Sequence, residues 1–221
     1  MKTTKKELIN KIDDLTNELR RAKRAINHLC LDIDASEKEE REFIGAQNVT
    51  IHAENALKRA NNEWNRNVTE PEYEGDWQRI TDYIHSSDGL NWYSDGYEYT
   101  KNGSFSWCGA FAAFCYSDAV LNTRKKIFPS CYRMYENWYD TRRRVKDIRP
   151  GDIVTVFTTA KKFYGDHIVL AADYPNEAGD FPTFEGNAKG AGPIGRIEGV
   201  IKRERNLNDV AYIYRLSAED F

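Results

Sequence analysis

Long apolar runs are missing from this 221-residue sequence. No stretch approaches the roughly 18 uninterrupted apolar residues that a membrane-spanning helix requires. Residues 1–14 alternate charged and isolated apolar positions, so we expect neither a secretory signal nor a membrane anchor there. A basic excess is missing too, because the formal net charge is −3. That balance argues against a dedicated nucleic-acid-binding protein, which is normally strongly basic.

Cysteine and histidine are scarce, with four residues of each. The cysteines show no CxxC pair and no spacing typical of a metal site: Cys30, Cys108, Cys115 and Cys131. A chain without a leader usually matures under reducing conditions, so we expect free thiols. We predict no required metal and no other cofactor.

The first third of the chain is rich in charged residues and poor in aromatic ones. Apolar residues recur there at alternating steps of four and three, the heptad pattern of a coiled coil. They are Leu8, Ile12, Leu15, Leu19, Ala22, Ile26, Leu29 and Ile33. Isoleucine at most positions of one core series and leucine at the other favour a parallel dimer. The pattern breaks at residues 36–40 and resumes in another phase, at Phe43, Ala46, Thr50, Ala53, Leu57, Ala60 and Trp64.

We therefore predict an α-helical coiled-coil arm over residues 1–68, a linker over 69–76 and a globular domain over 77–221. Pro71 and Gly75 mark the linker. A continuous helix of ~60 residues at ~1.5 Å each would span ~90 Å, which a small domain could hardly cover. We favour self-association or docking in a larger assembly over a helix that packs only on its own domain.

From Trp77 onward aromatic residues accumulate, and a short helix is predicted over Trp77–Ile84. In residues 104–116, SFSWCGAFAAFCY, a polar loop runs into small and apolar residues at helical spacing. Cys108 therefore falls in the first turn of a buried helix, where free N–H groups and the helix dipole lower the pKa of a thiol. A merely structural cysteine is the alternative for Cys108, and Cys115 is the better candidate for the core.

One histidine precedes a clear buried strand. His167 opens the run HIVLAA, and an earlier strand over 152–157 is joined to it by a turn-like segment, which predicts an antiparallel pair. A third strand ends with Glu185 and Asn187, and strands at 199–203 and 210–216 would complete a sheet of about five. Cysteine, histidine, then an amide or acid is the chain order of papain-like enzymes.

These motifs resemble the CHAP domain (cysteine, histidine-dependent amidohydrolase/peptidase), with NlpC-type cell-wall peptidases as more distant relatives. The resemblance covers residues 77–216 and lies in WCGAFAAF, PGDIV, DHIVLAAD, FEGNA, GVIKRERN and YIYRL. It implies a papain-like α+β fold with helices packed on an antiparallel sheet. It also implies cleavage of peptidoglycan, either at the sugar–peptide amide or within the peptides.

The resemblance implies a role for each site residue. Cys108 resembles the nucleophile, His167 the general base, Glu185 the residue that orients the histidine, and Asn187 the polar residue that completes the site. One departure is Val169, which stands where relatives often have glycine.

Substrate contacts are expected beside the nucleophile. Trp107 is expected in the cleft, and the small Gly109 leaves room for a substrate carbonyl. Further aromatic residues could line a groove for the glycan and peptide or belong to the core: Trp92, Tyr93, Tyr97 and Tyr99. Some CHAP domains bind calcium through an Asp-rich loop, but the spacing of Asp88 and Asp95 does not match it. Basic runs at 142–146 and 202–205 could attract anionic wall polymers, although such runs are more often solvated surface.

The long arm and the expected lack of a leader suggest a phage product. We expect a virion- or tail-associated lysin, or an enzyme released from the host cytoplasm to the wall. Its partners would be bacterial peptidoglycan and a second copy or other virion proteins, with no nucleic acid. Two alternatives stay open: a catalytically inactive structural or docking protein of a virus particle, and a cysteine hydrolase that acts on an amide outside the wall.

Overall fold

The computed structural model describes residues 5–70, 76–87, 106–116, 130–138, 142–143, 147–158, 163–193 and 195–217. The chain divides into two compact units, Met1–Ala46 and Gln47–Phe221. Helix α1 (Lys5–Asn65) contributes to both units. It contains no proline and a single glycine, Gly45, so nothing in its sequence ends it early.

The boundary between the two units lies between Ala46 and Gln47, whereas the sequence predicts a linker at residues 69–76. The last turns of α1 belong to the second unit, where Ala56 and Ala60 are buried and Leu57 packs against the same core. Small side chains let the backbones approach closely: a Cβ on Gly151 would lie 2.5 Å from the Ala53 Cβ. The second apolar series of the helix therefore packs on its own domain, which is the alternative that the sequence left open.

Part of the predicted linker is also integrated into the domain. Thr69 forms a bridge with Gly199, and Val68 accepts a backbone hydrogen bond of 3.0 Å from Val200. Glu70 donates its backbone N–H to Glu198 at 2.7 Å. These contacts all go to β5, the edge strand of the sheet, so residues 68–70 lie alongside that edge. Pro71 and Gly75 lie outside the described residues.

An antiparallel sheet forms the centre of the second unit, in the order β1-β6-β2-β3-β4-β5. Its strands are β1 (Arg142–Arg143), β2 (Ile153–Val156), β3 (His167–Ala171), β4 (Asp180–Gly192), β5 (Gly195–Asn206) and β6 (Val210–Tyr214). A 3₁₀ turn, η3 (Leu207–Asp209), joins β5 to β6. The predicted α+β class and the antiparallel pairing of the 152–157 and 167–172 strands are confirmed. β4 extends beyond Asn187, the predicted end of this strand, and forms a long hairpin with β5.

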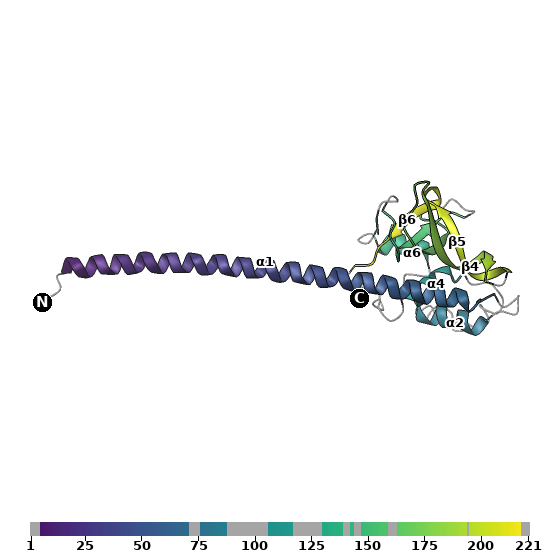
Figure 1. The fold of residues 1–221 in the computed structure, drawn as a ribbon, viewed down its shortest axis with the longest axis horizontal. Helices are drawn as coiled ribbons and strands as arrows, with labels where there is room; N and C mark the ends of the chain where they lie inside the picture. The colour runs from purple at the N-terminus through teal and green to yellow at the C-terminus, as the bar shows by residue number, and fades with distance from the viewer. Residues whose placement is uncertain are drawn as a thin grey trace. The chain divides into compact units, whose positions relative to one another are not determined.

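Helices cover one face of the sheet. α4 (Cys108–Cys115) packs against β3 and β4 on one side and against α2 (Trp77–Ser86) on the other. Figure 1 shows α2 and α4 beside the C-terminal end of α1, where Arg79 of α2 pairs with the buried Glu63 at 2.6 Å. Because α4 lies between α2 and the sheet, its first residue, Cys108, is next to the sheet.

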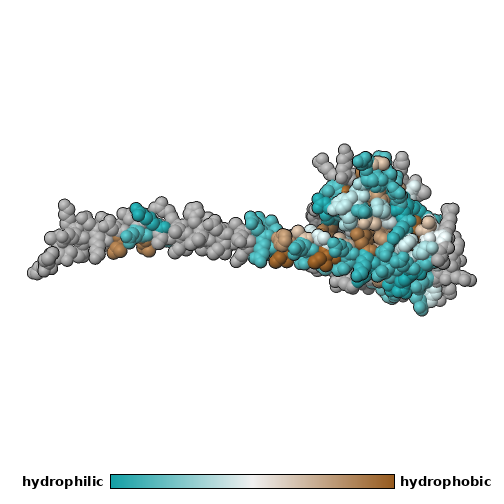
Figure 2. Space-filling view, in the orientation of Figure 1, coloured by the Kyte–Doolittle hydropathy of each residue, from teal (hydrophilic) through white to brown (hydrophobic). Residues whose placement is uncertain are grey.

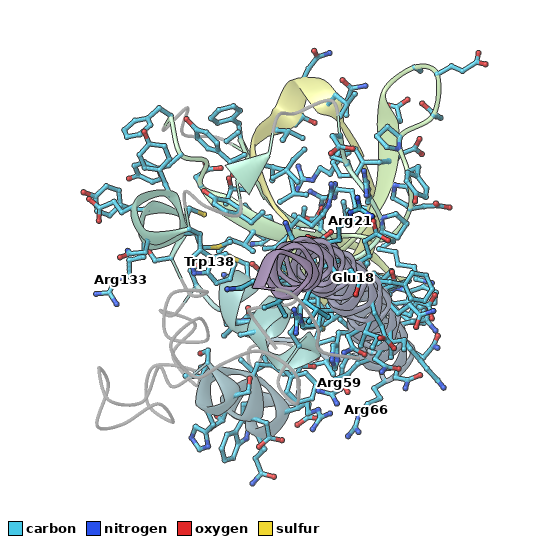
Figure 3. All side chains as sticks on the ribbon, turned by 90° about the vertical axis from the view of Figure 1, so that its left-hand side faces the viewer. Glu18, Arg21, Arg59, Arg66, Arg133 and Trp138 are labelled. Atoms are coloured by element: carbon cyan, nitrogen blue, oxygen red, sulfur yellow. The ribbon has the colours of Figure 1, made fainter. Side chains whose placement is uncertain are left out.

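Helix α6 (Cys131–Asn137) adds a further aromatic contact with the sheet. Trp138, just after it, is fully buried and lies edge-on to Tyr214 of β6, with ring centroids 5.9 Å apart. Figure 3 shows Trp138 turned inward and Arg133 pointing away from the sheet. Among the described helices, none combines the length and apolarity needed to cross a membrane.

Candidate functional site

Cys108 is the first residue of α4. Trp107 precedes it at the N-cap and provides no side-chain cap, so the first N–H groups of the helix are not satisfied by a capping side chain. Ser106 Oγ lies 3.7 Å from Cys108 Sγ. Cys108, Cys115 and Cys131 are free thiols, as predicted, and the side chain of Cys30 lies outside the described part of the structure.

His167 and Glu185 meet between neighbouring strands. His167 is the first residue of β3, and its Nε2 lies 3.2 Å from Glu185 Oε2 of β4. The imidazole also lies close enough to the Cys108 thiol for each group to shift the pKa of the other. Because Nε2 faces the carboxylate, Nδ1 is the nitrogen left for the sulfur. Three residues predicted from separate motifs are therefore in one contiguous chain of contacts.

Glu185 is held by donors on both oxygens. Oε1 accepts from Thr183 Oγ1 at 2.8 Å and from Arg205 Nε at 2.7 Å. Oε2 accepts from Arg205 Nη2 at 2.8 Å and faces His167. The carboxylate is 0% exposed, so these donors replace water completely.

The site is nearly closed to solvent, with Cys108 3% and His167 7% exposed. Burial by itself raises the pKa of Cys108, but the charge and hydrogen bond of His167, the Ile168 backbone N–H and Ser106 outweigh burial and lower that pKa. Burial opposes the charged form of His167 as well, yet Cys108 and Glu185 raise its pKa to about 9. These directions favour a thiolate–imidazolium pair.

Glu185 and Cys115 are both buried, but their pKa values shift in opposite directions. Burial favours the neutral form of Glu185, but His167 and Arg205 outweigh burial and hold the pKa of the carboxyl far below its usual range. At the other end of α4, burial and the nearby Glu63 raise the pKa of the Cys115 thiol and outweigh the opposing effect of Arg59 and Arg79. Two buried cysteines on one helix thus differ sharply in acidity, which makes Cys115 a matched control for Cys108.

The turn of β4 next to Glu185 fits closely against α4. A Cβ on Gly186 would lie 2.6 Å from Phe111 Cβ and 2.6 Å from Trp107 Cζ3, so no other residue fits without displacing the helix. The β4–β5 register shifts between Glu185 and Ala188, and Asn187 there has a φ of 55°. That left-handed conformation turns Asn187 Nδ2 to within 3.2 Å of Ser106 Oγ. Asn187 therefore reaches the site through Ser106.

The two residues predicted to contact substrate, Trp107 and Gly109, are both buried. Trp107 is in the core, and its indole N–H donates to the buried Glu70 at 2.6 Å. Gly109 is buried within α4. The physical reason is that the Glu70 carboxylate satisfies the indole inside the protein, so this tryptophan packs the helix layer. The other predicted groove aromatics, Trp92, Tyr93, Tyr97 and Tyr99, and the acidic Asp88 and Asp95 lie outside the described residues.

Arg205 is a site residue that sequence reasoning missed, because the 202–205 run is typical of solvated surface or of a patch that attracts anionic polymers. The register pairs Phe181 with Arg205 and Thr183 with Arg203, which puts both arginines on the same face of the sheet as Glu185. Alternation along the strand was a usable signal, but only once the register was known. Among the described residues, no group of three or more His, Cys, Asp or Glu side chains could hold a metal ion.

Comparison with known proteins adds no relative: no family model, no curated protein and no solved structure matches this chain.

Proposed function

We propose that this chain is a cysteine-dependent hydrolase that cleaves amide bonds of bacterial peptidoglycan. One observation carries the proposal: Cys108 at the start of α4 contacts His167, whose Nε2 is held by the buried carboxylate of Glu185. A thiol, a base and a group that orients the base are the parts that nucleophilic catalysis requires.

The first step is attack by the thiolate. The lowered pKa of Cys108 and the pKa of about 9 for His167 support an imidazolium–thiolate pair at neutral pH. The sulfur attacks the amide carbonyl and forms a tetrahedral intermediate. His167 then gives its proton to the leaving amine, the C–N bond breaks, and an acyl-thioester remains on Cys108.

The second step is hydrolysis of the thioester. His167, now neutral, takes a proton from water, whose oxygen attacks the acyl carbon and releases the acid and the thiol. Both tetrahedral intermediates carry an oxyanion beside the start of α4. The backbone N–H groups at the start of α4, including that of Cys108, can donate hydrogen bonds to this oxyanion. One such donor typically lowers the activation barrier by about 3 kcal/mol.

The substrate class rests on the resemblance of WCGAFAAF, DHIVLAAD and FEGNA to the CHAP domain. On this proposal the second unit has the papain-like fold, Asn187 positions Ser106 beside the thiol, and the bond cleaved is a sugar–peptide amide or a peptide bond of the wall. The helical arm would pair with a second copy or dock to virion proteins of a phage tail. The site would then open the cell wall locally.

A second candidate is a catalytically inactive docking protein with the same domain. The observation that favours it is the burial of the site, since Cys108 and His167 are nearly closed to solvent. A nucleophile must reach its carbonyl, so a permanently closed site would not turn over. The retained Cys108, His167 and Glu185 contacts favour the hydrolase.

The test compares three proteins on isolated peptidoglycan from several bacteria under reducing conditions: wild type, Cys108→Ala and Cys115→Ala. We expect soluble wall fragments from the wild type and from Cys115→Ala, and none from Cys108→Ala. Cys115→Ala controls for the loss of a buried thiol from the same helix. Folded wild-type protein that releases nothing from any wall would favour the docking protein or a hydrolase for another amide.

A further inference from the structure

Arg205 meets the Glu185 carboxylate side-on from β5. Its Nε lies 2.7 Å from Oε1 and its Nη2 lies 2.8 Å from Oε2. Two parallel N–H···O bonds from a planar fork fix the orientation of a carboxylate as well as its position. Arg203, on the same strand, comes only within 4.0 Å of Oε2.

Orientation matters here because Glu185 has two different neighbours. Its Oε1 accepts from Thr183, whereas its Oε2 faces the imidazole. A buried carboxylate without sufficient donors rotates toward new ones or takes up a proton. The arginine fork opposes both changes, because rotation breaks two charge-assisted bonds and protonation removes their acceptor.

We propose that Arg205 is a positioning residue of the site, which holds the Glu185 carboxylate with Oε2 turned to His167 Nε2 so that Nδ1 stays toward the Cys108 thiol. The inference rests on the proposed function for its catalytic meaning. Arg205 acts through Glu185, so its role is to position and not to react.

The charge of Arg205 has a second consequence. The charged and titratable groups that face this part of the site come from α4, the start of β3, β5 and η3: Cys108, Asp166, His167, Arg203, Arg205 and Asp209. Removing one positive charge from this set makes the surroundings more negative. More negative surroundings favour the protonated form of both the thiol and the imidazole.

Three variants separate charge from geometry. Arg205→Gln removes the charge and the fork, whereas Arg205→Lys keeps the charge as a single ammonium and removes the fork. Arg203→Gln is the matched control, since its side chain is 34% exposed against 9% for Arg205. The thiolate of Cys108 is followed by its ultraviolet absorbance against pH, after subtraction of the matching Cys108→Ala protein. The His167 imidazole is followed by NMR, and wall-fragment release gives the rate.

In Arg205→Gln, we expect both the thiolate and the neutral imidazole to form at higher pH than in the wild type. In Arg205→Lys, we expect both titrations to stay near those of the wild type while the rate falls on the order of 100-fold, because the base is misplaced. Arg203→Gln removes a more exposed charge that lies 4.0 Å from the carboxylate, so we expect it to shift both titrations less than Arg205→Gln does and to leave the rate near that of the wild type.

The inference is overturned if the two groups of Arg205→Gln titrate at the same pH as in the wild type, or if Arg205→Lys cleaves at the wild-type rate. Equal effects of Arg203→Gln and Arg205→Gln would also overturn it. If Arg205→Gln does not fold, the rate of Arg205→Lys decides. Both titrations are measured without peptidoglycan. Suppose that the wild type cleaves no wall, while the Cys108 and His167 titrations still move to higher pH in Arg205→Gln. That result would contradict the proposed function and leave the positioning role of Arg205 supported.

Discussion

At the scale of residues, charge alternates along the site from Cys108 through His167 and Glu185 to Arg205. Each of these groups is buried or mostly buried, and an isolated charge would be costly there. In the folded protein each charged group lies next to one of opposite sign, which stabilises it. Loss of one member therefore leaves its neighbour as an uncompensated buried charge, which costs more than the pair contributes.

The pH dependence of activity follows from two of these groups. The proposed mechanism needs the thiolate and the imidazolium together, so we expect activity to fall as pH drops through the lowered pKa of Cys108. It should also fall as pH rises through the His167 pKa of about 9. The two limbs belong to the coupled pair, and a rate–pH profile on soluble wall fragments measures them.

Glu185→Gln tests in which direction the alkaline limb of the rate–pH profile moves. The carboxylate favours the imidazolium, so its removal lowers the pKa of His167, and activity should be lost at lower pH than in the wild type. Glu204→Gln removes an exposed carboxylate of β5 and should leave the profile unchanged. An alkaline limb that stays in place, or moves upward, in Glu185→Gln would contradict the role given to this residue.

Prediction at the residue scale succeeded where local patterns set the position. Cys108 was placed by a change from polar loop to buried helix, and His167 and Glu185 by the ends of apolar strands. Arg205 and the burial of Trp107 depend on partners far away in the sequence, Glu185 and Glu70. A local sequence pattern cannot reveal contacts between residues so far apart in the sequence.

At the scale of elements, the site depends on how closely α4 lies on β4. Gly186 allows this approach, because it is the point where β4 passes against Phe111 and Trp107 of the helix layer. The position of Cys108 relative to Glu185 therefore depends on a residue that has no side chain.

Gly186→Ala should move the helix away from the sheet. The added Cβ would meet Phe111 Cβ and Trp107 Cζ3 at 2.6 Å, and neither belongs to a flexible chain end. We expect a loss of about 1–3 kcal/mol in the free energy of unfolding, the usual cost of overpacking, together with reduced activity. Urea unfolding and the wall assay measure the two effects.

Gly190→Ala is the control on the same strand. Its Cβ would meet the tip of Ile201, Cδ1, at 2.7 Å, and that methyl group can move. The smaller perturbation should leave both stability and activity closer to the wild type. Equal effects of the two substitutions would show that the α4–β4 contact has no special importance.

Elements with an apolar period were predictable, and elements without one were not. The strands at 152–157 and 167–172 and the helix from Trp77 were identified within two residues or so. The extension of β4 to Gly192 was missed because the run KGAGPIG has no alternation, and pairing with β5 alone makes it a strand. Helix α6 and the two-residue β1 are too short to give a periodic signal.

At the scale of the whole molecule, α1 serves two units. Its last turns pack in the globular unit, where Ala56 and Ala60 are buried. In the first unit, Leu15 and Leu19 are 58% and 70% exposed, and Figure 2 colours parts of α1 as hydrophobic surface. The helix itself was predictable from its period, but the period alone did not distinguish packing on the same chain from packing on another.

Self-association through the first unit is a prediction that can be tested directly. Exposed leucines at a heptad spacing lose contact with water when two helices pair, so we expect the wild type to be a dimer. Replacing Leu15 and Leu19 together by serine should give a monomer in analytical ultracentrifugation. The matched control replaces Glu18 and Arg21, exposed neighbours outside the heptad core, and should stay dimeric. A monomeric wild type, or a dimer that survives the leucine replacements, would rule out this interface.

The central claim is that Cys108 cleaves an amide bond of peptidoglycan, and mass spectrometry of the chain ends in released fragments tests it most directly. We expect wild-type protein to create new amino and carboxyl ends at one type of amide bond, and Cys108→Ala to create none. The type of bond would then identify an amidase or an endopeptidase. The same new ends in equal amounts from Cys108→Ala would contradict the claim.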